Sequence, residues 1–238
     1  MEITGYQRWR ELAFLHWPAD PAAVAPLLPP GLAVETFDGH AWLGIVALTM
    51  RDVRPRRVPA LPGISHFLEL NVRTYVRHGD EPGVWFFSLD AATLVAVAVA
   101  RAWWNLPYHP ARMATRRAGD VIAYRSRRAW GGARFAARYR VGPEIGTAVP
   151  GTFEHFVVER YRLFAHRGGR LYTGRVWHRP YPLHALEVLE LDESVLGAVG
   201  LRTRPPAAAG PAHALFSPGV EVGLSGRGPV TVIAGTGN

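Results

Sequence analysis

Segments of strand character alternate along the chain with glycine-containing turns, and this pattern limits the chain to a fold built from β-hairpins. Turns are predicted at Asp38-Gly39, Gly79–Gly83, Gly131-Gly132 and Gly168-Gly169, because these residues reach the backbone angles of tight hairpin turns. The segments between them alternate in polarity or are continuously apolar, as strands do. The predicted strands are Arg8–His16, Leu32–Phe37, Ala41–Met50, Leu68–His78, Val84–Leu89, Arg112–Arg117, Val121–Trp130, Ala133–Val141, Tyr161–His166, Arg170–His178, Leu183–Leu191 and several short strands after His213.

Helices are predicted at three places. They are a short helix that begins at Asp20-Pro21, an apolar helix over Ala91–Trp104 that Asp90 caps, and a short helix that Thr152 or Gly151 opens. The second helix is apolar nearly all round and is therefore expected to be buried. Many hairpins with few helices predict an α+β fold of mainly antiparallel strands. With no internal repeat and no break in composition, residues 1–238 are predicted to form a single domain.

The chain contains no lysine, so its 27 basic residues are all arginine, and its net charge is +8. Such a charge fits either a nucleic-acid-binding surface or a solvated face. On the arginine-rich hairpin, a two-residue turn at Gly131-Gly132 would place Arg125 opposite Arg138, with Arg127, Arg134 and Arg140 on the same face. No aromatic residue that could stack on bases lies among them, so we favour the solvated face.

The composition also excludes several kinds of chemistry. Without lysine, no lysine side chain can form a Schiff base with a substrate. Without cysteine, there are no disulfides, no thiol nucleophile and no thiolate-bound metal. The ten histidines show no metal-ligand spacing, so neither a metal nor a cofactor is expected.

No segment resembles a targeting or membrane-spanning sequence. Met1–Arg10 lacks the basic stretch and apolar run of a signal peptide. The longest apolar run, Ala91–Ala100, is shorter than the roughly 20 residues that cross a bilayer. We therefore expect a soluble, cytoplasmic protein that does not contact membranes.

The predicted strand Leu68–His78 has an unusual polar face. Glu69, Asn71 and Arg73 share this face, while leucine and valine occupy the other. The next strand, Val84–Leu89, is apolar on both faces, which indicates a position deep in the protein. The polar face therefore points either to solvent or into an internal cavity, and the pattern alone leaves both open.

Several segments together resemble the YqjF-like family of uncharacterised bacterial proteins, a domain of unknown function. The matching segments are Phe14–Pro18, Leu27–Leu32, Glu69–Val76, Trp85–Asp90, Leu106–His109 and Phe216–Val220. They occur in the family's order and extend over roughly residues 8 to 225. The family in turn is similar to the acetoacetate decarboxylase-like superfamily, whose fold is a cone-shaped antiparallel β-barrel with a few flanking helices.

The resemblance implies an internal cavity and so favours a site at Glu69, Asn71 and Arg73. In acetoacetate decarboxylase a lysine forms an imine with a β-keto acid. The corresponding region here holds Tyr108 and His109, and no other lysine exists to replace it. Decarboxylation through a lysine imine is therefore excluded.

Three hypotheses follow. The first is a lyase- or isomerase-type enzyme that acts on a small carboxylate or carbonyl compound inside the cone. Glu69 and His109 would exchange protons, Arg73 would hold an anionic group, and Asn71 and Tyr108 would donate hydrogen bonds. The second is a protein that binds or senses a metabolite in the same cavity without converting it. The third is an arginine-mediated nucleic-acid binder; assembly into homo-oligomers is open under all three.

Overall fold

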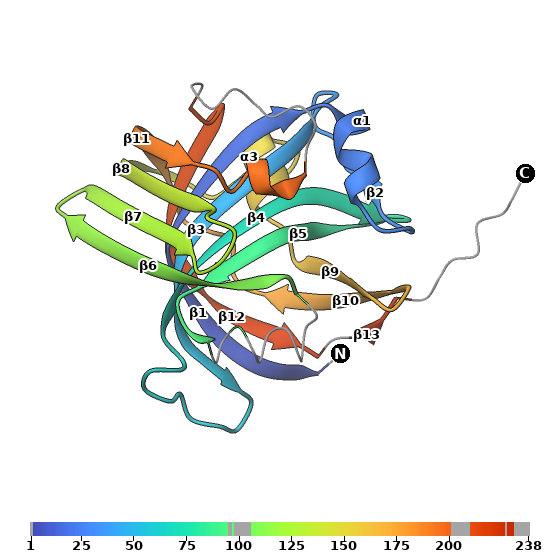
Figure 1. The fold of residues 1–238 in the computed structure, drawn as a ribbon, viewed down its shortest axis with the longest axis horizontal. Coiled ribbons are helices and arrows are strands. Elements are labelled where there is room, and N and C mark those ends of the chain that lie inside the picture. Colours follow the sequence, from blue (N-terminus) through green and yellow to red (C-terminus); the bar gives the residue numbers. More distant parts are fainter. Residues whose placement is uncertain (1, 95–96, 98–105, 201–209, 227, 231–238) are drawn as a thin grey trace, which may run out of the picture.

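The computed structural model describes residues 2–94, 97, 106–200, 210–226 and 228–230, and in this part of the chain nearly all regular structure is β (Figure 1). The strands are β1 Ile3–Ala19, β2 Ala33–Val34, β3 Ala41–Pro55, β4 Phe67–His78, β5 Glu81–Ala91, β6 Tyr108–Ala118, β7 Val121–Arg128, β8 Arg134–Gly146, β9 Arg162–Arg167, β10 Arg170–Trp177, β11 Leu183–Glu193, β12 His213–Ser225 and β13 Gly228–Pro229. The α-helices given bounds are α1, Pro21–Val24, and α3, Phe153–Val158, and short 3₁₀ turns cover Ala25–Leu27 and Gly197–Val199.

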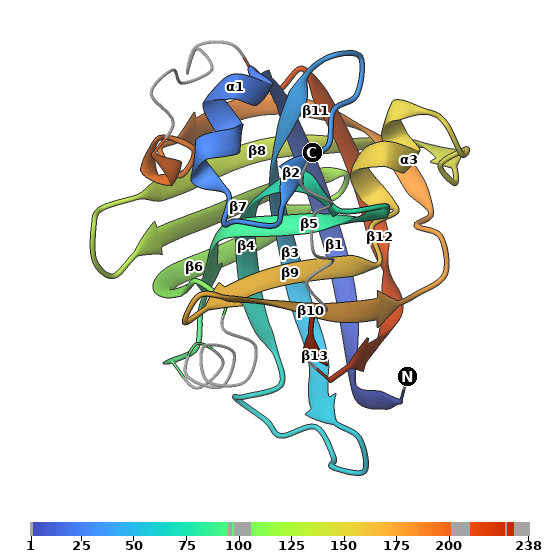
Figure 2. The same cartoon turned by 90° about the vertical axis from the view of Figure 1, so that its right-hand side faces the viewer.

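The strands form one sheet whose pairing returns on itself. The order is β13-β10-β9-β5-β6-β7-β8-β11-β12-β1-β3-β4-β2, and further pairings join β4 to β5 and β10 to β12. Neighbouring strands are antiparallel except that β5 runs parallel to β6 and to β9. Figure 2 shows β4, β5, β9 and β10 lying side by side, as these pairings require. The predicted class, mainly antiparallel strands with few helices, is confirmed.

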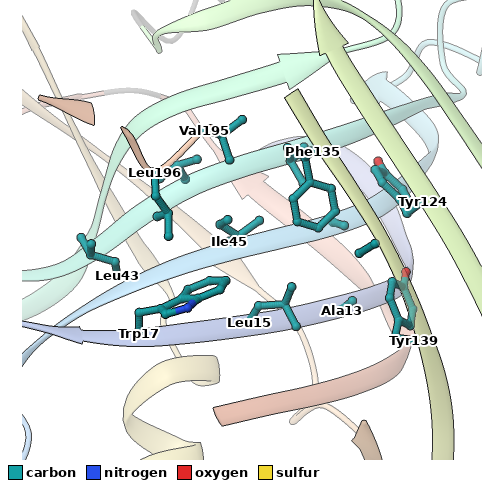
Figure 3. Close-up of a cluster of buried hydrophobic side chains, with 14 of the residues drawn as sticks. Ala13, Leu15, Trp17, Leu43, Ile45, Tyr124, Phe135, Tyr139, Val195 and Leu196 are labelled. Carbon is teal, nitrogen blue, oxygen red and sulfur yellow. The ribbon is translucent and has the colours of Figure 1, made fainter. Parts of the chain in front are cut away.

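Strands β1, β3 and β4 are buried on both faces, which explains their apolar runs. Leu15 and Ile45 point to one side, where they join a core cluster with Phe135 and other residues of β7 and β8 (Figure 3). Leu70 of β4 belongs to the same cluster. The residues between them point to the other side, toward β9, β10 and α3, and form a second cluster. The polar residues of β4 are on this second side.

Both short helices are opened as predicted. The Asp20 carboxylate accepts a hydrogen bond from Ala22 N at 2.8 Å, with Pro21 at the first helical position. Thr152 accepts from His155 N at the start of α3. The predicted turn at Asp38-Gly39 is also present, with positive φ at both residues.

Three local predictions are wrong. The segment before Asp38 does not pair with β3, because Ala33 and Val34 instead hydrogen-bond to β4. The chain after His213 forms mainly one long strand, β12, since it pairs with both β1 and β11. Asp90 does not cap a helix: it lies within β5, and its carboxylate accepts a hydrogen bond from Ser126.

The apolar helix predicted over Ala91–Trp104 falls mostly on residues that are not described. Ala91 belongs to β5, and Leu94 and Val97 are helical. Residues 95–96 and 98–104 lie outside the described part of the chain.

The register of the arginine-rich hairpin also differs from the prediction. Arg125 pairs with Ala136 rather than Arg138, because the connection between β7 and β8 is two residues longer than a Gly-Gly turn. The backbone N–H of Ala129 is bonded to Pro110 O on β6, so this residue does not pair with β8. Arg127 and Arg134 therefore form the opposed pair.

Strand β11 supplies acidic partners to this outer face. Arg134 pairs with Asp192 at 2.9 Å, Arg140 with Glu187 at 2.6 Å, and Arg138 with Glu190. These groups are about half exposed, which favours the interpretation as a solvated face. No helix among the described residues is long and apolar enough to span a bilayer.

Candidate functional site

A cavity of about 560 Å³ lies on the second side of β1, β3 and β4. Its wall is largely apolar and includes Phe14, Leu48 and Phe86. The polar face of β4 interrupts this wall, because Glu69, Asn71 and Arg73 all line the cavity. The strand pattern leaves open whether this polar face points to solvent or to a cavity, and in the structure it lines the cavity.

Glu69 is a buried carboxyl group held at the cavity wall. Its side chain is 5% exposed, and Tyr108 donates a hydrogen bond to its Oε2 at 2.7 Å. Burial raises the pKa of Glu69 from 4.5 to about 7, while the hydrogen bonds from Tyr108 and Asn71 act in the opposite direction. The nearby carboxylate of Asp90 raises the pKa further. A carboxyl with such a pKa can both take and give a proton near neutral pH.

Two tyrosines fix the position of Glu69. Tyr108 begins β6, where its backbone pairs with Leu89, and this brings its hydroxyl to the carboxyl. Burial, and then Glu69 itself, raises the pKa of Tyr108 well above 10, so the hydroxyl stays a donor. The hydroxyl of Tyr124 lies 2.8 Å from Glu69 O and 3.1 Å from Leu48 O, which ties the backbone of both strands to β7.

A buried ion pair lies next to this site and was not expected from the sequence. Arg128 Nε donates to Asp90 Oδ1 at 2.6 Å, and its terminal nitrogen donates to Ser88 at 2.6 Å. Side-chain exposure is 8% for Arg128 and 1% for Asp90. The signal was present in the sequence, since Arg128 alternates with Ser126 and Tyr124 on the inward face of β7.

Asn71 and Arg73 each present a buried polar atom without a partner. Asn71 is 6% exposed, and its Oδ1 accepts no hydrogen bond. Arg73 donates to Val157 O at 2.9 Å, and its guanidinium lies 5.6 Å from the ring centres of Phe14 and Tyr75. Its Nε is buried and unpaired. Such atoms are costly in an apolar wall unless a ligand or water binds them.

Two further arginines near β9, Arg160 and Arg162, line the cavity together with Arg54, and all three were missed. Arg160 lies 4.4 Å from the ring centre of Phe156 and pairs with Glu35 at 2.7 Å, and burial lowers its pKa. Arg162 forms an ion pair with Glu81. Their spacing of two around the start of β9 is a strand pattern that could have identified them as sharing a face.

His109 follows Tyr108 on β6, and neighbouring residues of a strand point to opposite faces. It is not among the described residues that line the cavity. The structure thus brings together four of the five predicted residues: Glu69, Asn71, Arg73 and Tyr108. Within the described ranges, no cluster of three or more histidine or acidic side chains could hold a metal ion.

This fold is that of the acetoacetate decarboxylase-like proteins. An acetoacetate decarboxylase-like enzyme from Sphingomonas wittichii RW1 aligns over 97% of this chain and 94% of its own, with a TM-score of 0.63 and 15% identity. The enduracididine biosynthesis enzyme MppR complexed with pyruvate aligns over 97% and 92%, with a TM-score of 0.66 and 13% identity. Acetoacetate decarboxylase from Legionella pneumophila aligns over 96% and 88%, with a TM-score of 0.64 and 13% identity. At these identities the likeness concerns the fold.

The chain belongs to the DUF2071 family, described as "Uncharacterized conserved protein", whose model matches residues 6–221. It is also 36% identical over 196 residues to the uncharacterized protein YqjF of Bacillus subtilis (strain 168), which covers 82% of this chain and 81% of YqjF. The resemblance to the YqjF-like family that the sequence indicated is thereby confirmed.

Proposed function

We propose that this protein is an enzyme in which Glu69 exchanges a proton with a carboxylate or carbonyl compound bound in the cavity. The observation that carries the proposal is a buried carboxyl, with its pKa raised to about 7, at the wall of a 560 Å³ cavity. A pKa near the working pH is what general acid–base catalysis requires. The reaction would be of lyase or isomerase type and would not use a Schiff base.

In this proposal the Glu69 carboxylate takes a proton from the carbon next to a carbonyl group. The electron pair of the broken C–H bond forms the C=C bond of an enolate, and the carbonyl oxygen gains the negative charge. Where a second C=C bond is conjugated with the enolate, return of the proton from Glu69 to the far carbon of that bond shifts the double bond and gives an isomer. Alternatively, loss of a leaving group from the next carbon gives a lyase product, with the proton going to that group.

Each neighbouring residue has a role in this scheme. Tyr108, 2.7 Å from the carboxyl, keeps it oriented and limits the rise of its pKa. Arg73 binds the anionic group of the ligand, and Asn71 Oδ1 accepts a hydrogen bond from a separate donor group of the ligand. His109 has no role in the proposal, because it is not among the described residues of the cavity wall.

The architecture in this proposal is a single domain over residues 1–238, a cone-shaped β-barrel closed by the pairings of β4 with β5 and of β10 with β12. Support comes from the solved neighbours, since MppR has been observed with pyruvate in a fold of the same kind. With no lysine in this chain, the chemistry depends on a carboxyl group instead.

Deuterium exchange tests the proposal. The protein is incubated in D₂O with a panel of 2-oxo and 3-oxo acids, pyruvate included, and carbon-bound deuterium is measured by NMR. We expect exchange that rises with the ionisation of a group of pKa about 7. Glu69→Gln should abolish exchange and retain binding, while Glu190→Gln, an exposed glutamate on the outer face, should leave exchange unchanged.

The outcomes separate the hypotheses. Binding by wild-type protein without exchange at any pH would favour the metabolite-binding alternative and overturn the enzymatic proposal. Exchange that persists in Glu69→Gln would remove Glu69 as the proton carrier. Failure of the whole panel to bind or exchange would overturn the proposal as stated.

A further inference from the structure

Arg73 differs from Arg160 and Arg162, two other arginines of the cavity wall, in having no carboxylate partner among the described residues. Arg160 and Arg162 are neutralised by Glu35 and Glu81. All the acidic residues of the chain lie in its described part, and none is within 4.0 Å of the Arg73 guanidinium. A charge partly removed from water is costly unless an anion accompanies it, so Arg73 favours an anionic ligand.

Arg73 is also separated from Glu69 along the cavity wall. Glu69, Asn71 and Arg73 occupy alternate positions of β4, with Cα atoms of the outer two roughly 13 Å apart at the usual rise of a strand. The hydrogen bond to Val157 O and the rings of Phe14 and Tyr75 hold the guanidinium at its own end. The unpaired acceptor of Asn71 lies between the two.

The cavity as a whole is far larger than a small acid needs. Even at about 30 Å³ for each non-hydrogen atom, the volume of a water molecule in the liquid, a six-atom acid such as pyruvate fills roughly 180 Å³. The cavity measures about 560 Å³, and its remaining wall is apolar, including Leu48, Met50 and Phe67. Cavities of this size and lining usually bind molecules with a substantial apolar body.

We infer that the ligand is a carboxylic acid with an apolar body of medium length, whose carboxylate binds Arg73 while a distant carbon reaches Glu69. A hydroxyl or other donor midway along it would bind Asn71 Oδ1. This inference rests on the proposed function and replaces its general substrate, a small carboxylate or carbonyl compound, with a longer and more apolar acid.

A chain-length series tests the inference. Binding of unbranched carboxylates from butyrate to decanoate, and of the matching alcohols, is measured by calorimetry on the full chain below their micelle concentrations. We expect affinity to rise about fourfold per methylene until the cavity is filled, as burial of each CH₂ predicts. Acids should bind at least tenfold more tightly than alcohols of equal length.

Variants assign the two ends of the site. Arg73→Gln should remove the preference for acids and leave the dependence on length intact, whereas the control Arg138→Gln, on the outer face, should change neither. Leu48→Phe should weaken the binding of decanoate much more than that of butyrate, because the larger ring fills part of the cavity beside the apolar wall. If Leu48→Phe does not fold, the series on wild type and Arg73→Gln is sufficient.

The results distinguish this inference from the proposed function. Butyrate binding as tightly as decanoate, with dependence on Arg73, would overturn the inference and leave the proton-exchange proposal standing. Binding that depends on chain length, without proton exchange with any oxo acid, would support the inference and overturn the proton-exchange proposal. Acid binding unaffected by Arg73→Gln would overturn Arg73 as the anchor.

Discussion

Replacing Glu69 with glutamine should change how the stability of the protein depends on pH. The carboxyl has a pKa of about 7 in the folded protein and about 4.5 in the unfolded chain. Between these values the unfolded chain has released the proton while the folded protein still binds it. A raised folded pKa therefore contributes stability that is complete below pH 4.5 and is lost as the pH rises to about 7.

The size of the effect follows from the pKa difference. A difference of about 2.5 units, at 1.36 kcal/mol per unit, corresponds to about 3 kcal/mol of unfolding free energy. Glu69→Gln has the same shape and cannot ionise, so it lacks this dependence. Relative to wild type, the variant should gain about 3 kcal/mol between pH 4 and pH 8.

Urea unfolding of both proteins at intervals across this pH range measures the difference directly. Glu190→Gln, an exposed carboxyl on the outer face, serves as the matched control and should track wild type closely. A difference between wild type and Glu69→Gln that stays constant within about 1 kcal/mol would refute the reasoning, since it would mean that burial does not raise the Glu69 pKa.

Removing the hydrogen bond that Tyr108 donates should shift the pH at which Glu69 ionises. A hydrogen bond to a charged group contributes about 1.5–3 kcal/mol, so Tyr108→Phe should raise the Glu69 pKa by about 1–2 units. The pH dependence of deuterium exchange and of stability should shift upward together. An unchanged pH dependence would show that the hydrogen bond to Oε2 does not control the ionisation.

Three other changes have defined outcomes. Asp90→Asn should destabilise the fold by about 3–5 kcal/mol in urea unfolding, because it leaves the buried Arg128 without its counter-ion, and a loss below 1 kcal/mol would contradict a buried ion pair. Gly219→Ala should lower the unfolding free energy by more than about 4 kcal/mol or prevent folding, since its φ is +132° and a Cβ there would lie 2.0 Å from Trp9 O. The control Gly210→Ala, with open space around its Cβ, should leave thermal unfolding unchanged. Burial, with the charges of Arg73 and His213, lowers the pKa of His16 well below 6.5. The difference in unfolding free energy between wild type and His16→Gln should therefore shrink as the pH falls below 6.5. A difference that does not depend on pH would contradict this cause.

Much of the fold was predictable because its signals are local. Asp20 before Pro21 and Thr152 before an apolar turn open helices through their own side chains, so no distant contact is needed. Strand pairing is less local. The connection after Arg128 was misjudged because Ala129 bonds to Pro110 on a strand that precedes it, which the Gly-Gly sequence cannot reveal.

The candidate site was predictable to the extent that it lies on one strand. Glu69, Asn71 and Arg73 share a face by alternation alone, and only their burial had to come from the fold. Asp90 was misjudged because the local pattern gives no hint of which neighbours surround it. Asp90 precedes an apolar run, as a helix cap does, yet in the sheet its carboxylate forms an ion pair with the buried Arg128.

The same distinction bears on how far the solved relatives can explain this protein. Identities of 12–15% accompany a shared course of the strands, because a fold tolerates many apolar exchanges of similar volume. A shared fold does not carry reacting groups with it, and a chain without lysine cannot perform imine chemistry through a lysine side chain whatever its fold. In the proposed function the chemistry therefore comes from the residues that this sequence places in the cavity. There, burial raises the pKa of Glu69 to about 7, and Arg73 has no counter-ion among the described residues. We therefore propose Glu69 as the proton carrier and Arg73 as the anion anchor, in place of a lysine.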